Sequence, residues 1–183
     1  MSLRYALLGF LNLGPMTGYD LKKQLDRSTQ NFWHAGLNQI YPTLKKMEDE
    51  GWITSSVEPQ EARPDRVVYH MSETGRRELL DWLAEPLAEL PRRRHSGLLK
   101  LFFAGYLEPD EALNQLRAQL ELHREQLAAH DQTRAMIAEV AAKEPRLERS
   151  AVFWELVRDL GERNERMYVD WLEHSIETVE EIK

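Results

Sequence analysis

Over most of this chain, apolar residues recur with the three- and four-residue spacing of amphipathic helices. The first 51 residues predict three helices, over residues 3–13, 17–27 and 38–50. The turn "GPMTG" separates the first two. Thr17, with Asp20 three residues later, predicts a capping box at the start of the second helix. Gly51 is expected to end the third helix.

Two short β-prone runs follow, "WITSSV" and "RVVYHM", and the turn-forming stretch "EPQEARPD" separates them. Together they predict a two-stranded hairpin with a long loop. Ser72 is then expected to cap a helix that stops near Pro86. Three helices, a hairpin and a fourth helix in this order predict a winged helix-turn-helix, in which the hairpin is the wing.

The segment "PLAELPRRRHSG" marks a boundary, because it combines two prolines with a basic run. The basic run could contact DNA phosphates, but we expect it to be a solvated hinge; its residues are Arg92, Arg93 and Arg94. Beyond it the pattern is helical throughout, over residues 98–106, 109–142 and from near Pro145 almost to the end. We therefore expect a mostly α-helical protein with three parts. These are a winged helix domain over residues 1–86, a hinge over 87–97 and a long-helix domain over 98–183.

The last helix carries a nearly continuous apolar stripe that is close to a heptad pattern. Its members are Phe153, Val157, Leu160, Asn164, Met167, Trp171 and Val179. At about 1.5 Å per residue the helix would be on the order of 50 Å long. A helix of this length with a continuous apolar stripe, beside so small a core, usually packs against a partner chain.

The net charge of −7 argues by itself against binding to nucleic acid. Its distribution changes that inference. Residues 1–80 hold ten Lys and Arg against ten Asp and Glu, whereas residues 81–183 hold fourteen against twenty-one. The predicted winged helix domain is therefore neutral and can still present a local basic face.

Several classes of protein are disfavoured by what the sequence lacks. The absence of cysteine excludes a disulfide scaffold, a thiolate zinc site and a thiol nucleophile. Because phosphate-binding glycine loops, nucleophile elbows and zinc-protease motifs are also missing, we expect neither an enzyme nor a cofactor or metal. No apolar stretch approaches the roughly 20 residues that span a bilayer, and the apolar amino terminus lacks a signal-peptide cleavage site. The expected location is the cytoplasm.

The proline in the third helix orients that helix. Because proline is tolerated only near a helix start, we expect Asn38 as the N-cap and Pro42 in the opening turns. The core side then comprises Ile40, Leu44, Met47 and Gly51. We call the outward side of the first two turns the recognition face; its members are Asn38, Gln39, Tyr41, Pro42, Lys45 and Lys46.

The recognition face contains no carboxylate, since Glu48, Asp49 and Glu50 all lie at the far end of the helix. A helix that enters a DNA major groove with its amino-terminal residues has this asymmetry. In the hairpin loop, Arg63 and Arg66 suit contacts to phosphates or to the minor groove.

Two tyrosines near this face have alternative roles. Tyr19, at the start of the second helix, suits a phosphate contact and a core position equally. Tyr69 suits packing within the wing better than a contact with DNA.

Three stretches together resemble PadR-family transcriptional regulators over residues 3–84. They are "LLGFLNLGPMTGYDLKKQL", "FWHAGLNQIYPTLKKMEDEGWI" and "RPDRVVYHMSETGRRELLDWL". The pattern Q-I-Y-P-x-L-x-x-[LM]-E-x-x-G, followed by [ST]-E-x-G, is specific and occurs in the family's order and spacing. Met47 stands where leucine is commoner, a core change of little consequence. The later helices are similar in length and pattern to the longer branch of the family.

The resemblance implies a homodimeric regulator, most often a repressor, whose recognition helix spans residues 38–46. It implies that the later helices carry dimerisation and that a small aromatic or hydrophobic effector, such as a phenolic acid, releases the DNA. The operator would be an inverted repeat of double-stranded DNA. The alternative from another class is a winged-helix protein-interaction module without DNA binding. The polar and basic recognition face favours DNA.

Aromatic residues in the second domain are candidates for an effector pocket, since clefts between helices are common ligand sites. Packing in an ordinary helical core is the alternative for the same residues. The candidates are Phe102, Phe103, Tyr106, Trp154, Tyr168 and Trp171.

Two histidines lie seven residues apart on one predicted helix of this domain, His123 and His130. This separation is too long for one metal ion to bridge. A pH-sensing contact across a helix seam is possible for such residues, and we expect half-exposed surface histidines.

Overall fold

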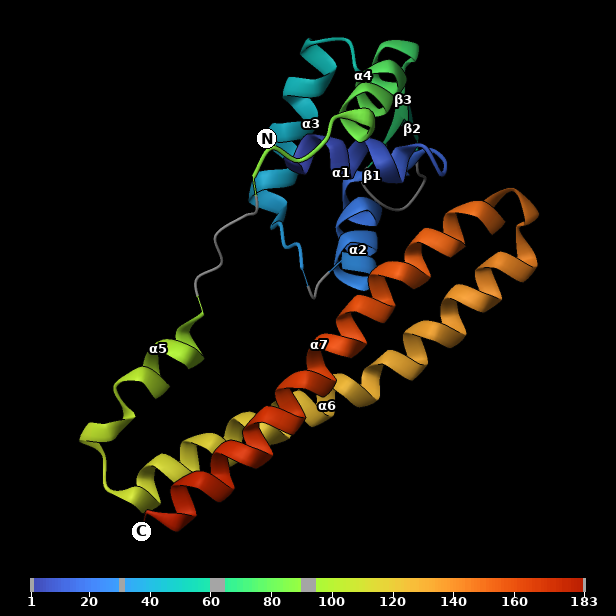
Figure 1. Ribbon diagram of the computed structural model, residues 1–183. Coiled ribbons are helices and arrows are strands. Elements are labelled where there is room, and N and C mark those ends of the chain that lie inside the picture. Colours follow the sequence, from blue (N-terminus) through green and yellow to red (C-terminus); the bar gives the residue numbers. More distant parts are fainter. Residues whose placement is uncertain (1, 30–31, 60–64, 90–94, 183) are drawn as a thin grey trace. The chain divides into compact units, whose positions relative to one another are not determined.

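The computed structural model describes residues 2–29, 32–59, 65–89 and 95–182, and the chain divides into two compact units, Met1–Pro91 and Arg92–Lys183. The first unit contains α1 (Ser2–Leu11), β1 (Met16–Thr17), α2 (Gly18–Thr29), α3 (Leu37–Asp49), β2 (Ile53–Glu58), β3 (Arg66–Met71) and α4 (Glu73–Ala84) (Figure 1). The second contains α5 (Ser96–Phe102), α6 (Pro109–Lys143), α7 (Glu148–Glu181) and the 3-10 turns η1 (Ala104–Tyr106) and η2 (Pro145–Leu147).

The first unit has the predicted winged-helix order, with one strand more than the sequence indicated. β2 and β3 form the predicted antiparallel hairpin, in which Ile53 pairs with Met71. The extra strand, β1, has two residues and comes from the "GPMTG" turn. It pairs with the other edge of β3, so that the order in the sheet is β1-β3-β2. Thr17 of β1 lies opposite Val68.

The core of the first unit is formed by the apolar sides of its helices against the sheet. Buried side chains from α1, α2 and α3 meet Trp52, Ile53 and Leu79. The helical members of this cluster are Leu7, Leu8, Leu11, Leu21, Leu25, Ile40, Leu44 and Met47. Because eight of these side chains come from three successive helices, the core fixes how α3 is held against the rest of the unit.

Two of the predicted caps are confirmed by their hydrogen bonds. The Thr17 hydroxyl accepts from the Asp20 amide at 3.1 Å, and the Thr17 amide donates to the Asp20 carboxylate at 3.4 Å, which completes the capping box of α2. The Ser72 hydroxyl accepts from the Gly75 amide at 3.0 Å and so caps α4. These contacts are local in the sequence, and that is why the sequence predicts them.

In the second unit, α6 and α7 run in opposite directions and lie side by side (Figure 1). Leu116, Leu120 and Leu172 form a buried cluster between them, against which Leu101 of α5 packs. The predicted apolar segment over residues 98–106 is two elements, α5 and η1. Among the described residues, no helix is both long and apolar enough to cross a membrane.

The expectation of half-exposed histidines is wrong for His130. This side chain is buried on α6, where a Cβ added at Gly161 of α7 would lie only 2.7 Å from the imidazole Cε1. His123 is half-buried, and its Nδ1 lies 2.6 Å from a carboxylate oxygen of Glu165. The glycine on the facing helix lets His130 fill the space between the two helices, a feature that no spacing within α6 indicates.

Candidate nucleic-acid interface

The start of α3 differs from the sequence prediction. The N-cap is Gly36 and not Asn38, and the side-chain oxygen of Gln39 accepts a hydrogen bond from the Gly36 amide at 3.1 Å. Pro42 therefore lies in the second turn, where it cannot donate to the carbonyl of Asn38. That carbonyl belongs to an exposed residue, so water can satisfy it. The sequence placed the N-cap too late because glycine is also an acceptable N-cap residue.

The predicted core side of α3 is confirmed except at its end. Ile40, Leu44 and Met47 are fully buried, whereas Gly51 is exposed. Gly51 instead ends the helix with a positive φ of 74°. Its amide donates to the Glu48 carbonyl, and the Trp52 amide donates to the Met47 carbonyl. This is the Schellman arrangement that a glycine after the C-cap allows.

The six members of the recognition face are all exposed. The ring of Tyr41 lies against the first residue of α2, since a Cβ added at Gly18 would be 2.6 Å from its Cε1. The side-chain oxygen of Asn38 folds back over the helix start, where a Cβ at Gly36 would lie 2.4 Å away. Lys45 and Lys46 extend from the outer surface of the helix.

The acidic end of α3 is tied to other elements. Glu48 accepts a hydrogen bond from the Ser55 hydroxyl of β2 at 2.6 Å. Glu50 is paired with Arg4 of α1, whose guanidinium also lies over the ring of Trp52. Glu50 also lies 4.0 Å from the ammonium of Lys46, the last member of the recognition face. The tied carboxylates therefore lie at the carboxy-terminal end of the helix, beyond its first two turns. The charge asymmetry seen in the sequence is therefore also present in the folded unit.

Of the two arginines predicted to contact DNA from the wing, the structure describes only Arg66. Arg63 lies outside the described residues, as do Arg92, Arg93 and Arg94 of the basic run. Arg66 is the first residue of β3, and its guanidinium lies 3.3 Å from the Asp20 carboxylate of α2. This ion pair joins two residues that are 46 positions apart in the sequence. The sequence predicts only the capping role of Asp20, because its second partner lies on a distant strand.

A hollow of about 650 Å³ lies between the start of α2, the outward side of α3 and the beginning of β3. Tyr19 is 65% exposed, which is incompatible with a core position. Tyr69 is half-buried, and burial raises the pKa of its phenol, with further contributions from Glu48 and Tyr41. Its hydroxyl therefore stays protonated over the physiological range. The hollow between α2, α3 and β3 is lined by Thr17, Gly18, Tyr19, Asp20, Tyr41, Asp65, Arg66, Val67 and Tyr69.

The six aromatic candidates for an effector pocket do not form one cluster by their ring contacts. Phe103 contacts Phe102 and Tyr106 within the α5–η1 region, where all three rings are largely exposed. Tyr168 and Trp171 contact each other on α7, with ring centroids 6.2 Å apart. Trp154 precedes Tyr168 by fourteen residues on the same helix, about 21 Å along its axis.

Two imidazoles flank Tyr168, and no pattern in the sequence predicts this contact. The His123 ring stacks on the tyrosine with centroids 4.5 Å apart, and the His95 ring stacks at 5.5 Å. The Nδ1 atom of His95 accepts a hydrogen bond from the Leu98 amide and so caps α5. Neutral His95 therefore carries its proton on Nε2, which donates to the Tyr168 hydroxyl at 2.9 Å.

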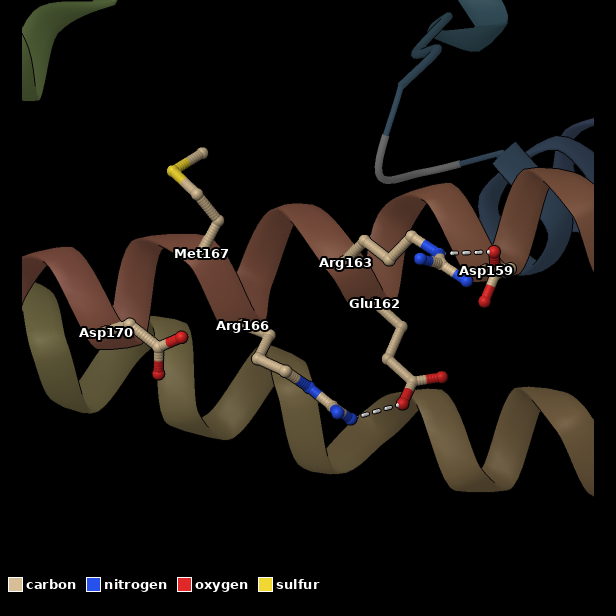
Figure 2. Close-up of a pocket in the computed structure, with 6 residues that line it drawn as sticks. All are labelled: Asp159, Glu162, Arg163, Arg166, Met167 and Asp170. Atoms are coloured by element: carbon tan, nitrogen blue, oxygen red, sulfur yellow. Dashed lines mark hydrogen bonds and ion pairs between the residues drawn. The ribbon is translucent and has the colours of Figure 1, made fainter.

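A second hollow lies on α7 and is lined by charged pairs, not by aromatic rings. Figure 2 shows Arg163 bound to Asp159, and Arg166 bound to Glu162. The hydrogen bond from Arg158, a buried residue, holds the pKa of Glu162 below its usual range. The hollow measures about 340 Å³ and is lined by Asp159, Glu162, Arg163, Arg166, Met167 and Asp170. Among the described residues, no group of three His, Asp or Glu side chains is arranged to hold a metal ion.

Comparisons with known protein families and curated proteins match nearly the whole chain. The model of the transcriptional regulator PadR-like family matches residues 7–81, and the "Virulence activator alpha C-term" model matches residues 93–180. A probable transcriptional regulator from Mycobacterium tuberculosis is 34% identical over 190 residues and covers 99% of both chains. The negative transcriptional regulator PadR of Bacillus subtilis is 33% identical over 174 residues, 93% of each.

Solved structures have the same fold over both units. PadR of Bacillus subtilis in complex with operator DNA gives a TM-score of 0.84 at 28% identity, covering 98% of this chain and 99% of that one. The same regulator in complex with p-coumaric acid gives 0.75 at 28% identity, covering 97% and 95%. The virulence activator AphA of Vibrio cholerae gives 0.73 at 23% identity over the full length of both chains, a likeness of fold alone.

Proposed function

The chain belongs to the PadR-like family of transcriptional regulators, and on this premise we propose that it binds double-stranded DNA through the recognition face of α3. The observation that carries the proposal is the exposed recognition face, which contains no carboxylate, together with Arg66 at the start of the wing strand β3. Gln39 can pair with adenine, and Lys45 can reach guanine or a phosphate. The relative solved with operator DNA supports the same use of this fold.

A homodimer is the second part of the proposal, and the apolar stripe of α7 supports it. Side chains of this stripe remain about half-exposed or more in the single chain, which is unusual for so many large apolar groups on one helix. They include Phe153, Val157, Leu160 and Met167. Covering the stripe with a second copy would relate two α3 helices by a two-fold axis. The operator is then an inverted repeat whose half-sites are about 34 Å apart.

Repression relieved by a small aromatic or hydrophobic effector is the third part. One relative is named a negative regulator, and its structure has been solved with p-coumaric acid. In this chain, the surroundings of Tyr168 offer stacked rings and a hydroxyl hydrogen-bonded to His95. An effector would favour a dimer geometry that misplaces the two recognition helices, with a coupling of typically 1–3 kcal/mol.

The test is fluorescence anisotropy with labelled DNA from upstream of the protein's own gene, measured across a salt series with unlabelled competitor. We expect tight binding that resists nonspecific competitor and weakens with salt, because phosphate contacts release counterions. Addition of p-coumaric acid and related phenolic acids to the complex then tests release. The absence of binding to any DNA at low salt would support a protein-interaction module.

A further inference from the structure

Asp20 is an acidic residue inside the candidate DNA interface, where a carboxylate would repel phosphates. Its side chain lines the same hollow as Tyr41 and Arg66. An acid at this place needs a physical explanation, because the neighbouring recognition face of α3 has none. The hydrogen bonds accepted by the Oδ2 atom of Asp20 provide this explanation.

Three donors reach the Oδ2 atom of Asp20. The Thr17 hydroxyl donates at 2.7 Å, the Thr17 amide at 3.4 Å and the guanidinium of Arg66 at 3.3 Å. The first two join Asp20 to the N-cap residue of α2. The third comes from the opposite side of the hollow, so that the same carboxylate serves the start of a helix and the start of the wing strand.

The strand pairing brings Arg66 to this carboxylate. Thr17, which Asp20 binds, lies opposite Val68 in the β1–β3 ladder. Val68 is two residues beyond Arg66, and residues two apart on a strand point to the same face of a sheet. The two-residue strand β1 thus sets the register in which the capping box of α2 faces the first side chain of β3.

Gly18 brings the recognition helix to the same point. The Tyr41 ring occupies the space where a side chain at Gly18 would lie. Helix α3, the start of α2 and the start of β3 therefore meet within a span of four residues, 17–20. The position of the Arg66 side chain relative to Tyr41 depends on this junction.

We propose that Asp20 is a positioning residue of the DNA interface, which holds the Arg66 guanidinium beside Tyr41 so that wing and recognition helix contact the same stretch of DNA backbone. The inference rests on the proposed DNA binding and deepens it. Asp20 itself touches no DNA. Its charge offsets that of Arg66 in the free protein and limits the side chain to one region of the hollow.

The sign of the effect distinguishes positioning from simple electrostatics. Loss of a carboxylate near phosphates should by itself tighten binding to DNA. Loss of a positioning contact should weaken binding, because a freed arginine must be ordered when the complex forms. Ordering one long side chain corresponds to roughly a 2- to 10-fold change in affinity. A weaker complex after removal of an acid is therefore the diagnostic result.

The experiment is a double-mutant cycle on the full-length protein, with Asp20→Asn, Arg66→Gln and the double variant, each titrated with operator DNA at several salt concentrations. Asparagine keeps an oxygen that can accept from Thr17 and removes the charge that holds Arg66. We expect Asp20→Asn to weaken binding roughly 2- to 10-fold and Arg66→Gln to lower the salt slope by about 0.9. In the Arg66→Gln background, Asp20→Asn should weaken binding no further.

Asp49→Asn on α3 is the matched control, because it also removes an exposed carboxylate from the same unit but lies at the far end of the helix. It should leave affinity unchanged or slightly increase it. Thermal unfolding of each variant reports the integrity of the helix cap. Equal weakening by Asp20→Asn in both backgrounds would assign Asp20 to the cap alone and overturn the inference.

Two further outcomes separate this inference from the proposed function. If the unaltered protein binds operator DNA and Asp20→Asn binds as tightly or more tightly, the positioning role is wrong and the proposed function stands. If the unaltered protein binds no DNA at low salt, the proposed function fails, and the positioning role for DNA is overturned with it.

Discussion

Lys45 is the residue on which the proposed DNA contact depends most directly. It lies on the exposed outer surface of α3, one turn from Tyr41 and away from the tied carboxylates of Glu48 and Glu50. Its side chain therefore contributes a positive charge that no folded-state contact requires. A residue of this kind can be changed with little effect on stability and a large effect on binding.

Reversal of this charge in Lys45→Glu should weaken binding to operator DNA by roughly 100-fold or more, because it removes a phosphate or base contact and introduces repulsion. Fluorescence anisotropy measures the loss, and sedimentation shows whether the oligomeric state is kept. The matched control is Lys143→Glu at the end of α6, an exposed lysine of the second unit. If Lys45→Glu binds normally, the assignment of the recognition face is wrong.

Two helical glycines of the first unit differ in the space beside them: Gly75 is closely packed and Gly9 is open. Adding one methyl group at each position tests this difference in packing. A Cβ added at Gly75 would lie 2.1 Å from the Trp52 carbonyl oxygen, whereas one added at Gly9 would meet nothing within 4 Å. Gly75→Ala should destabilise the protein by about 1–3 kcal/mol through overpacking against backbone. Gly9→Ala should stabilise it by about 0.5–1 kcal/mol through helix propensity. Urea denaturation of both variants checks the pair, and equal stabilities would contradict the packing of α4 on Trp52.

At the scale of elements, the α6–α7 pair is held by charged contacts as well as by apolar ones. Arg158 of α7 is buried and pairs with Glu155 and Glu162 on its own helix. Glu162 also pairs with Arg134 of α6 at 2.8 Å. One carboxylate therefore links a buried guanidinium to the facing helix, and its protonation affects both.

The stability of this pair should depend on pH through Glu162. Its pKa in the folded protein is lowered, mainly by the hydrogen bond from Arg158. Its stabilising contribution is therefore present above the pKa of the unfolded chain, about 4.5, and is lost as the pH falls through the lower folded value. Thermal unfolding should show a loss of stability in acid that is smaller in Glu162→Gln. Glu177→Gln, an exposed carboxylate of the same helix, serves as the control and should retain the full acid dependence.

At the scale of the whole molecule, the proposed homodimer explains why one chain leaves so much apolar surface on α7 uncovered. Leu160 is 60% exposed and lies in the middle of the stripe. A charge placed there would be buried without a partner in the dimer, at a cost of about 3–5 kcal/mol. The same charge would remain in water in the monomer.

Leu160→Glu should therefore shift the protein toward monomers, as measured by sedimentation equilibrium over a range of concentrations. DNA binding should weaken in parallel, because a monomer contacts only one half-site. Ala128→Glu on the exposed surface of α6 is the control and should keep the oligomeric state. A dimer of unchanged affinity in Leu160→Glu would place the interface elsewhere.

The sequence by itself determined the features that depend on neighbouring residues. The helix periods, the Thr17 and Ser72 caps, the wing strands and the carboxylate-free recognition face all follow from side chains within a few positions of each other. The proline of α3 gave the correct core side even though the N-cap proved to be Gly36. Local hydrogen bonds and helical spacing act at short range, so that their signals are present in the sequence.

Only the tertiary structure decided the features that join distant residues. Strand β1 forms because β3 offers a free edge to two residues of a turn. The pair of Asp20 with Arg66, the burial of His130 against Gly161 and the stacking of two imidazoles on Tyr168 each depend on how separate elements pack. The aromatic candidates looked like one set in the sequence and fall into separate groups in space. A linear pattern records which face a residue occupies, whereas its partner is selected by the register and close packing of the folded elements.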